Sequence, residues 1–111
     1  MPVSFGLKTA TWLDALLAAR RRLHGLRRDS LALQFGGAAG TLAALGDQGL
    51  AVSAALAAEL DLALPALPWH GNRDRVVAIG MAIGMLTGSL GKIAHDVALL
   101  MQSEVGEVRV A

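Results

Sequence analysis

The sequence predicts an all-α fold, a bundle segment made of long helices, and three observations support this prediction. Apolar residues recur at spacings of three, four and seven along most of the 111-residue chain. Hydrophobic residues make up 54% of the chain and aromatic residues only 4%, so Ala, Leu and Val carry the apolar surface. Glycines recur every three or four residues in one segment, which lets another helix approach closely. One unit spanning residues 1–111 is the expected organisation.

Three helices are expected from the periodicity and from helix-forming composition. The first covers about residues 3–28, with apolar residues on one face and arginines on the solvated face. The second covers about 49–60, an alanine-rich run of strong helix formers, with Asp47 available as its cap. The third and longest covers about 72–103 and carries Asp74 in its first turn, where a negative charge suits the helix dipole.

Two irregular segments are expected between these helices. Three glycines fall within five residues at Gly36–Gly40, and each lowers helix stability by roughly 1 kcal/mol relative to Ala. Pro65 and Pro68 mark the second segment, because each lacks a backbone donor and pushes the preceding residue out of helical geometry. Both segments should therefore connect helices as loops.

The third helix contains an uncharged stretch, Val76–Leu90, and a row of glycines on one face. We call this the glycine row: Gly80, Gly84, Gly88 and Gly91. Such a helix could span a membrane as a dimerisation helix, but buried helices of large soluble oligomers are also apolar all round. Arg75 and Lys92 bound the stretch closely, so we favour a soluble helix whose glycine row docks on another helix.

Composition and charge argue against several classes of function. The formal net charge of +1 gives no long-range attraction for nucleic acid, so no nucleic-acid partner is expected. Without cysteine there is no disulfide framework and no thiolate nucleophile, and a cytoplasmic location fits best. The histidines are widely separated and lack metal-ligand spacing, so we expect no metal: His24, His70 and His95.

Two short segments contain candidate binding residues, and each has a structural alternative. The segment Gly36–Thr41 lacks the ending of a P-loop, so Walker-type nucleotide binding is rejected. Its glycines could bring the backbone close to a small anionic substrate, with the Thr41 hydroxyl as a donor, or simply form a helix-crossing corner. His70 and Arg73 stand together at the entry to the third helix, where Arg73 could bind a carboxylate or pair with a neighbouring acid.

Three ordered motifs resemble the fumarase/aspartase superfamily, in the form found in its 3-carboxy-cis,cis-muconate cycloisomerases. Residues 33–42, LQFGGAAGTL, look like the glycine-rich corner of that superfamily. Residues 67–75 resemble its Pro-Trp-His-x-x-Arg-Asp-Arg entry to a long central helix, although Gly71 and Asn72 replace the more usual Thr-Gln. Residues 90–108 are similar to the end of that helix. The resemblance covers nearly the whole chain.

The resemblance implies that the chain is part of the central helical domain, whose long helices associate into a homotetramer with each active site built from several subunits. The superfamily's signature loop, which carries a mobile catalytic serine, should follow Glu107, and its conserved His-containing segment should precede Met1. The chain is therefore expected to be a fragment with no catalytic residue of its own and no turnover in isolation.

The function implied for the parent protein is lactonising cycloisomerisation of 3-carboxy-cis,cis-muconate, in aromatic catabolism through the β-ketoadipate pathway, without metal or cofactor. The substrate, a di- or tricarboxylate, would contact a wall formed by Gly37, Gly40 and Thr41, with His70 and Arg73 as further candidates. One alternative is adenylosuccinate lyase or another fumarate-releasing lyase of the same superfamily. The other is a non-catalytic helical assembly or a membrane-associated module.

Overall fold

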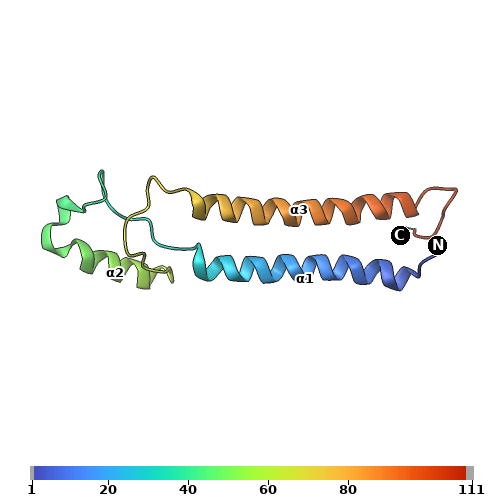
Figure 1. Cartoon of the computed structure of the whole chain (residues 1–111), viewed down its shortest axis with the longest axis horizontal. Helices are drawn as coiled ribbons and strands as arrows, with labels where there is room; N and C mark the ends of the chain where they lie inside the picture. The colour runs from blue at the N-terminus through green and yellow to red at the C-terminus, as the bar shows by residue number, and fades with distance from the viewer. Residues whose placement is uncertain (1, 110–111) are drawn as a thin grey trace. The chain divides into compact units, whose positions relative to one another are not determined.

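The computed structural model describes residues 2–109, apart from the side chains of residues 28 and 29, and it is built from helices. Figure 1 shows the α-helices and a short 3₁₀ helix in chain order: α1 (Phe5–Asp29), η1 (Ala43–Gln48), α2 (Gly49–Glu59) and α3 (Asp74–Leu100). No strand forms within the described residues, where the one β-bridge is parallel and isolated and joins Ala32 to Ala63. The all-α prediction is confirmed.

The first and last helices end close to the predicted residues, and local hydrogen bonds explain where they differ. Ser4 stands just before α1, and its hydroxyl accepts the backbone N–H of Leu7 at 3.2 Å, so the helix begins at Phe5. Asp74 lies in the first turn of α3, as predicted. The helix ends at Leu100, whose carbonyl accepts the backbone N–H of Glu107 at 3.0 Å and so turns the chain back.

The prediction that Asp47 caps the second helix is wrong. The residue preceding α2 is Gln48, and no side chain caps the helix. Instead the unpredicted 3₁₀ helix η1 leads directly into α2, and the N–H of Gly49 donates to the carbonyl of Gly46. A backbone carbonyl of η1, and not a capping side chain, therefore accepts the N–H of Gly49 at the start of α2.

Contacts within the chain group it into two compact units, where the sequence predicts one. Unit 1 is formed by Met1–Arg22 together with Met81–Ala111, and unit 2 by Leu23–Gly80. Unit 1 therefore contains most of α1 and α3, while unit 2 contains η1, α2 and the two irregular segments. That both belong to one helical domain of a larger assembly stays a prediction.

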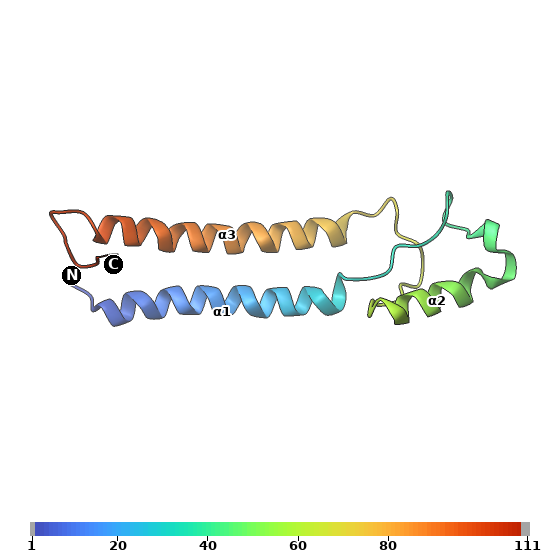
Figure 2. The ribbon, with the colours of Figure 1, turned by 180° about the vertical axis from the view of Figure 1, so that it is seen from behind.

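In unit 1, α1 and α3 run side by side in opposite directions, as both Figure 1 and the reverse view in Figure 2 show. Polar groups join them: the indole N–H of Trp12 donates to Asp96 Oδ2 at 2.8 Å, and Lys92 forms an ion pair with the same carboxylate. The Lys92 amine also lies 5.9 Å from the centroid of the Trp12 ring. These contacts form the only polar link between the helices that the described part of unit 1 contains, and we call them the Trp12–Asp96 clasp.

The Trp12–Asp96 clasp predicts that the protein becomes less stable as the pH falls into the acid range. The hydrogen bond from Lys92, and then that from Trp12, lowers the pKa of Asp96 below its usual value. A lowered carboxyl pKa stabilises the fold fully above the unfolded value, about 3.9, and this contribution disappears as the pH falls through the lower folded value. Asp96→Asn should therefore lower the urea unfolding midpoint at pH 7. The gap to the unmodified protein should narrow as the pH falls below the unfolded carboxyl value and then through the lower folded value; an equal gap at every pH would contradict this account.

The chain buries few large apolar side chains by itself. Among the described residues none of the large side chains is fully buried. Six apolar residues are buried: Ala19, Ala32, Leu33, Ala57, Ala82 and Leu100. Four of these six are alanines. Long side chains on α3 remain exposed, including Met81 at 63% and Ile83 at 52%. Exposed apolar surface of this extent is typical of helices that pack against further protein.

No helix of the described chain packs tightly on the glycine row, although Gly88 lines a groove between α3 and α1. A Cβ atom built at any of its four glycines would find no neighbouring atom within 4 Å in the described residues. Helix α3 is also long and apolar enough to cross a membrane, with a mean hydropathy of 1.7 over 18 residues. Within the described residues, neither α1 nor α2 supplies the partner helix that the sequence predicts for this face, so that docking stays a prediction.

Candidate functional site

The candidate site lies in unit 2 and centres on residues 36–41, here called the glycine corner. Gly37 and Gly40 have φ angles of +70° and +80°, which side chains disfavour and glycine adopts freely. The N–H of Leu42 donates to the carbonyl of Gly36 at 3.0 Å and closes the loop. The corner is therefore a defined backbone turn, as the prediction of a break between helices requires.

A short extended segment holds the start of the corner in place. Leu33 is 5% exposed, and its N–H donates to the carbonyl of Ala63 at 2.9 Å. The N–H of Ala63 in turn donates to the carbonyl of Leu31 at 3.2 Å. These two bonds join the segments on either side of α2, so the backbone leading into the corner is fixed.

Pro68 and His70 pack directly on the corner. A Cβ atom at Gly36 would overlap the His70 ring and would lie 3.0 Å from both Pro68 Cβ and Gly40 Cα. The Nε2 of His70 lies 3.1 Å from the carbonyl oxygen of Gly37. Because a carbonyl only accepts, Nε2 must carry the proton in this bond, which leaves Nδ1 for other partners.

Two cavities open beside the corner. One, of about 320 Å³, is lined by backbone and small side chains with one imidazole: Ala38, Ala39, Gly40, Pro68, His70 and Gly71. The other, of about 530 Å³, is more apolar and has Gly40 and Thr41 in its wall beside Leu33, Leu64 and Pro68. Both volumes suit a small molecule, and Gly40 contributes to both.

The structure brings together four of the five predicted substrate-binding residues. Gly37 and Gly40 lie in the corner, His70 binds the carbonyl of Gly37, and Thr41 adjoins Gly40 in the larger cavity wall. Arg73 is exposed and lines neither cavity, and within the described residues it has no carboxylate partner within 4.0 Å. A binding role for these residues stays a prediction, and the geometry supports Arg73 least.

Sequence reasoning missed the contribution of Pro68 and of the Leu33 backbone. The sequence marks Pro68 as a helix breaker and as part of the Pro-Trp-His motif but predicts no contact for it, yet its ring carbons lie 3.6 and 3.8 Å from the position of a Cβ on Gly40. The carbonyl of Leu33 accepts a hydrogen bond from the indole of Trp69 at 2.9 Å. The proximity of residues 33–40 to residues 68–70 is a tertiary contact that no local pattern encodes.

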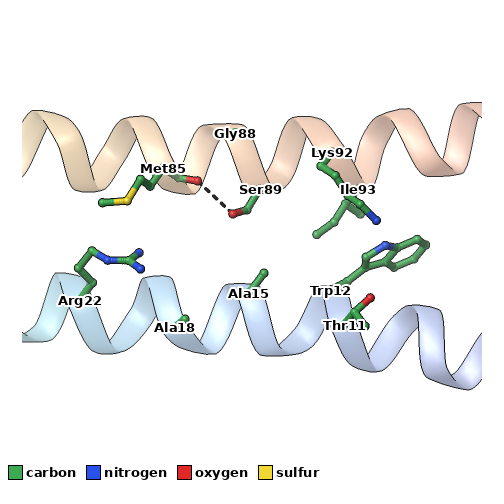
Figure 3. Close-up of a pocket in the computed structure, with 10 residues that line it drawn as sticks. All are labelled: Thr11, Trp12, Ala15, Ala18, Arg22, Met85, Gly88, Ser89, Lys92 and Ile93. Atoms are coloured by element: carbon green, nitrogen blue, oxygen red, sulfur yellow. Dashed lines mark hydrogen bonds between the residues drawn. The ribbon is translucent and has the colours of Figure 1, made fainter.

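Unit 1 contains a separate groove between α1 and α3, shown in Figure 3, with a volume of about 590 Å³. Its wall includes the Trp12 ring, the Lys92 amine and the Arg22 guanidinium, and the Ser89 hydroxyl there donates to the carbonyl of Met85 at 3.0 Å. None of the predicted site residues lines it, and Lys92 is already paired with Asp96. The candidate site is therefore the glycine corner.

Titratable and metal-binding groups are sparse in the part of the chain that the structure describes. No group of three or more His, Cys, Asp or Glu side chains gathers there as a set of metal ligands. Among the described residues, His70 is the one titratable side chain that lines these two cavities. The corner can therefore bind and orient a small polar molecule through backbone groups and one imidazole.

Comparison with known proteins gives consistent matches along the chain. The family model described as "Lyase" matches residues 1–111. The chain is 58% identical over 107 residues to 3-carboxy-cis,cis-muconate cycloisomerase of Bradyrhizobium diazoefficiens, covering 96% of this chain and 24% of the relative. It is 59% identical over 107 residues to the enzyme of the same name from Pseudomonas aeruginosa, covering 96% of this chain and 23% of the relative.

A solved structure matches as well. The β-carboxy-cis,cis-muconate cycloisomerase of Acinetobacter calcoaceticus superimposes with a TM-score of 0.88 at 42% identity, covering 94% of this chain and 24% of that one. The chain thus spans about a quarter of the length of the relatives that it matches.

Proposed function

Because the chain belongs to this lyase family, the fumarase/aspartase superfamily, we propose that the full-length protein is a 3-carboxy-cis,cis-muconate cycloisomerase. The observation that carries the proposal is the identity of more than half of the aligned residues to two enzymes with this name. The aligned region covers 96% of this chain, so it includes the segments that form the candidate site.

The proposed reaction is an intramolecular addition. A substrate carboxylate oxygen forms a bond to one carbon of a C=C double bond, and the π electrons move to the neighbouring carbon. A general acid then protonates that carbon, so substrate and lactone have the same composition. Negative charge develops beside a carboxylate during this step, and fixed donors that face it lower the barrier.

This segment supplies part of the wall of the site and no acid or base. The glycine corner would present its backbone to a flat carboxylated substrate at Gly40, which lines both cavities, while Gly37 lines neither cavity and contributes through its carbonyl bond to His70. Thr41 offers a hydroxyl in the wall of the 530 Å³ cavity, and His70 lines the 320 Å³ cavity with Nδ1 not used by the bond to Gly37. The general acid comes from residues outside this chain, so the isolated 111-residue segment should show no turnover.

We also propose a homotetramer in which α3 and the glycine row pack against other copies. The exposed apolar side chains of α3 and its empty glycine face support burial by a partner. The interruption of the apolar stretch by glycines and by Thr87 and Ser89 favours protein over lipid as that partner. The full-length protein should be cytoplasmic and should remain in the supernatant after detergent-free fractionation; recovery only with membranes would refute this part.

The cycloisomerase proposal predicts a specific substrate preference. Purified full-length protein should convert 3-carboxy-cis,cis-muconate to carboxymuconolactone and should leave adenylosuccinate unchanged. Loss of the conjugated diene absorbance and chromatographic detection of fumarate measure the two outcomes in parallel. Fumarate release from adenylosuccinate, with no lactone from carboxymuconate, would favour the fumarate-releasing alternative.

A further inference from the structure

The indole of Trp69 is tied to the backbone that enters the glycine corner. Its N–H donates to the carbonyl oxygen of Leu33 at 2.9 Å. Leu33 is buried, and its own N–H donates a hydrogen bond to the carbonyl of Ala63, so the accepting carbonyl cannot move freely. The bond therefore fixes Trp69 relative to the start of the corner, three residues before Gly36.

The same ring is also tied to the start of α3. The guanidinium carbon of Arg75 lies 5.7 Å from the centroid of the Trp69 ring, within the range of a cation–π contact. Arg75 is in the first turn of α3, which begins at Asp74. Trp69 is thus held from two sides by elements far apart in the sequence.

The two neighbours of Trp69 are the residues that pack on the corner. Pro68 contacts the Gly36 and Gly40 positions, and His70 binds the carbonyl of Gly37. The carbonyl of Trp69 accepts the backbone N–H of Asn72 at 3.0 Å, so Trp69 begins a closed turn that contains His70. Because Pro68 and His70 are covalently joined to Trp69, holding its ring limits the movement of the backbone that carries both side chains. The ring is partly buried, so this anchor is protected from competing water.

We propose that Trp69 is a positioning residue that acts through His70. It holds the imidazole with Nε2–H on the carbonyl of Gly37, so that Nδ1 is the nitrogen presented to the substrate. A neutral Nδ1 accepts a hydrogen bond, and a protonated one donates to a carboxylate. This inference rests on the proposed function, because it takes His70 as part of the substrate wall.

The test compares two tryptophans in the full-length enzyme. Trp69→Phe removes the N–H and keeps an aromatic ring, and Trp12→Phe removes the indole bond of the clasp in unit 1 as a matched control. We expect Trp69→Phe to lower kcat/KM for 3-carboxy-cis,cis-muconate by about 3- to 10-fold, the loss of one net hydrogen bond. Trp12→Phe should leave kcat/KM within about twofold.

A double-mutant cycle then separates positioning from general structural damage. In a His70→Ala background Trp69→Phe should lower kcat/KM no further, because the residue through which Trp69 acts is gone. An undiminished effect in that background, or no effect of His70→Ala alone, would overturn the inference. If Trp69→Phe fails to fold, replacing Trp69 with benzothienylalanine removes only the N–H and serves in its place.

A spectroscopic measurement tests the positioning role without turnover. Nitrogen-15 NMR of the histidine rings should show His70 protonated at Nε2, with this tautomer fraction reduced by Trp69→Phe and unchanged by Trp12→Phe. An unchanged His70 tautomer in Trp69→Phe would overturn the inference. Absence of any lactone from the unmodified enzyme would instead refute the proposed function, and the NMR result would still decide the positioning role.

Discussion

Substituting Gly36 with Ala should destabilise the protein by about 1–3 kcal/mol, the usual cost of forcing a methyl group into a filled space. The added Cβ would overlap the His70 ring and press on Pro68 and on the backbone at Gly40. Moving the ring would break its bond to the carbonyl of Gly37, so kcat/KM for carboxymuconate should fall as well. Urea unfolding and steady-state kinetics of the full-length enzyme measure the two effects.

Gly71→Ala is the matched control for this substitution. Gly71 is adjacent to His70 and lines the same small cavity, but a Cβ there would meet no atom within 4 Å. Its unfolding free energy should change by no more than about 0.5 kcal/mol. Equal stability of the Gly36 and Gly71 variants would show that Pro68 and His70 do not pack on the corner as described.

Substituting Gly84 with Leu should weaken assembly of the full-length protein. Within the described residues nothing lies within 4 Å of a Cβ built at Gly84, so an isolated helix would gain roughly 1 kcal/mol from the better helix former. If another copy packs on the glycine row, the bulky side chain separates the two helices. An overpacking cost of about 1–3 kcal/mol per contact raises the subunit dissociation constant roughly 5- to 150-fold.

Gly25→Leu provides the comparison, because Gly25 is also helical and lies outside the glycine row, and a Cβ built there would also meet no described atom within 4 Å. Light scattering with size-exclusion chromatography over a dilution series should show earlier dissociation for the Gly84 variant only. Identical masses for both variants at every dilution would mean that no helix docks on the glycine row.

The helices were predictable because their signals are local. The long periodic segments specify α1 and α3, and the alanine-rich run specifies α2, each within a few residues of the predicted range. Their ends were less predictable, because the Leu100 carbonyl that closes α3 pairs with a residue beyond the periodic segment. The 3₁₀ helix η1 was missed because its sequence, AALGDQ, carries no distinctive periodicity.

The candidate site was predictable only in part. The glycines of the corner and His70 were found from composition and resemblance, and the structure places them in contact. The roles of Pro68 and of the Leu33 carbonyl depend on contacts between the loop that precedes η1 and α2 in the sequence and the loop that follows α2. A local sequence pattern cannot show such contacts. Arg73 was chosen for its chemistry, but it lies outside both cavities because the chain enters α3 immediately after it.

The central claim is that this segment belongs to an enzyme that adds a carboxylate and a proton across a double bond. The most direct measurement is turnover of 3-carboxy-cis,cis-muconate by the full-length protein in D₂O, with mass spectrometry of the product. Because the general acid exchanges its proton with solvent, we predict a lactone with one carbon-bound deuterium and otherwise the composition of the substrate. A product that has lost CO₂, or the release of fumarate, would contradict the claim.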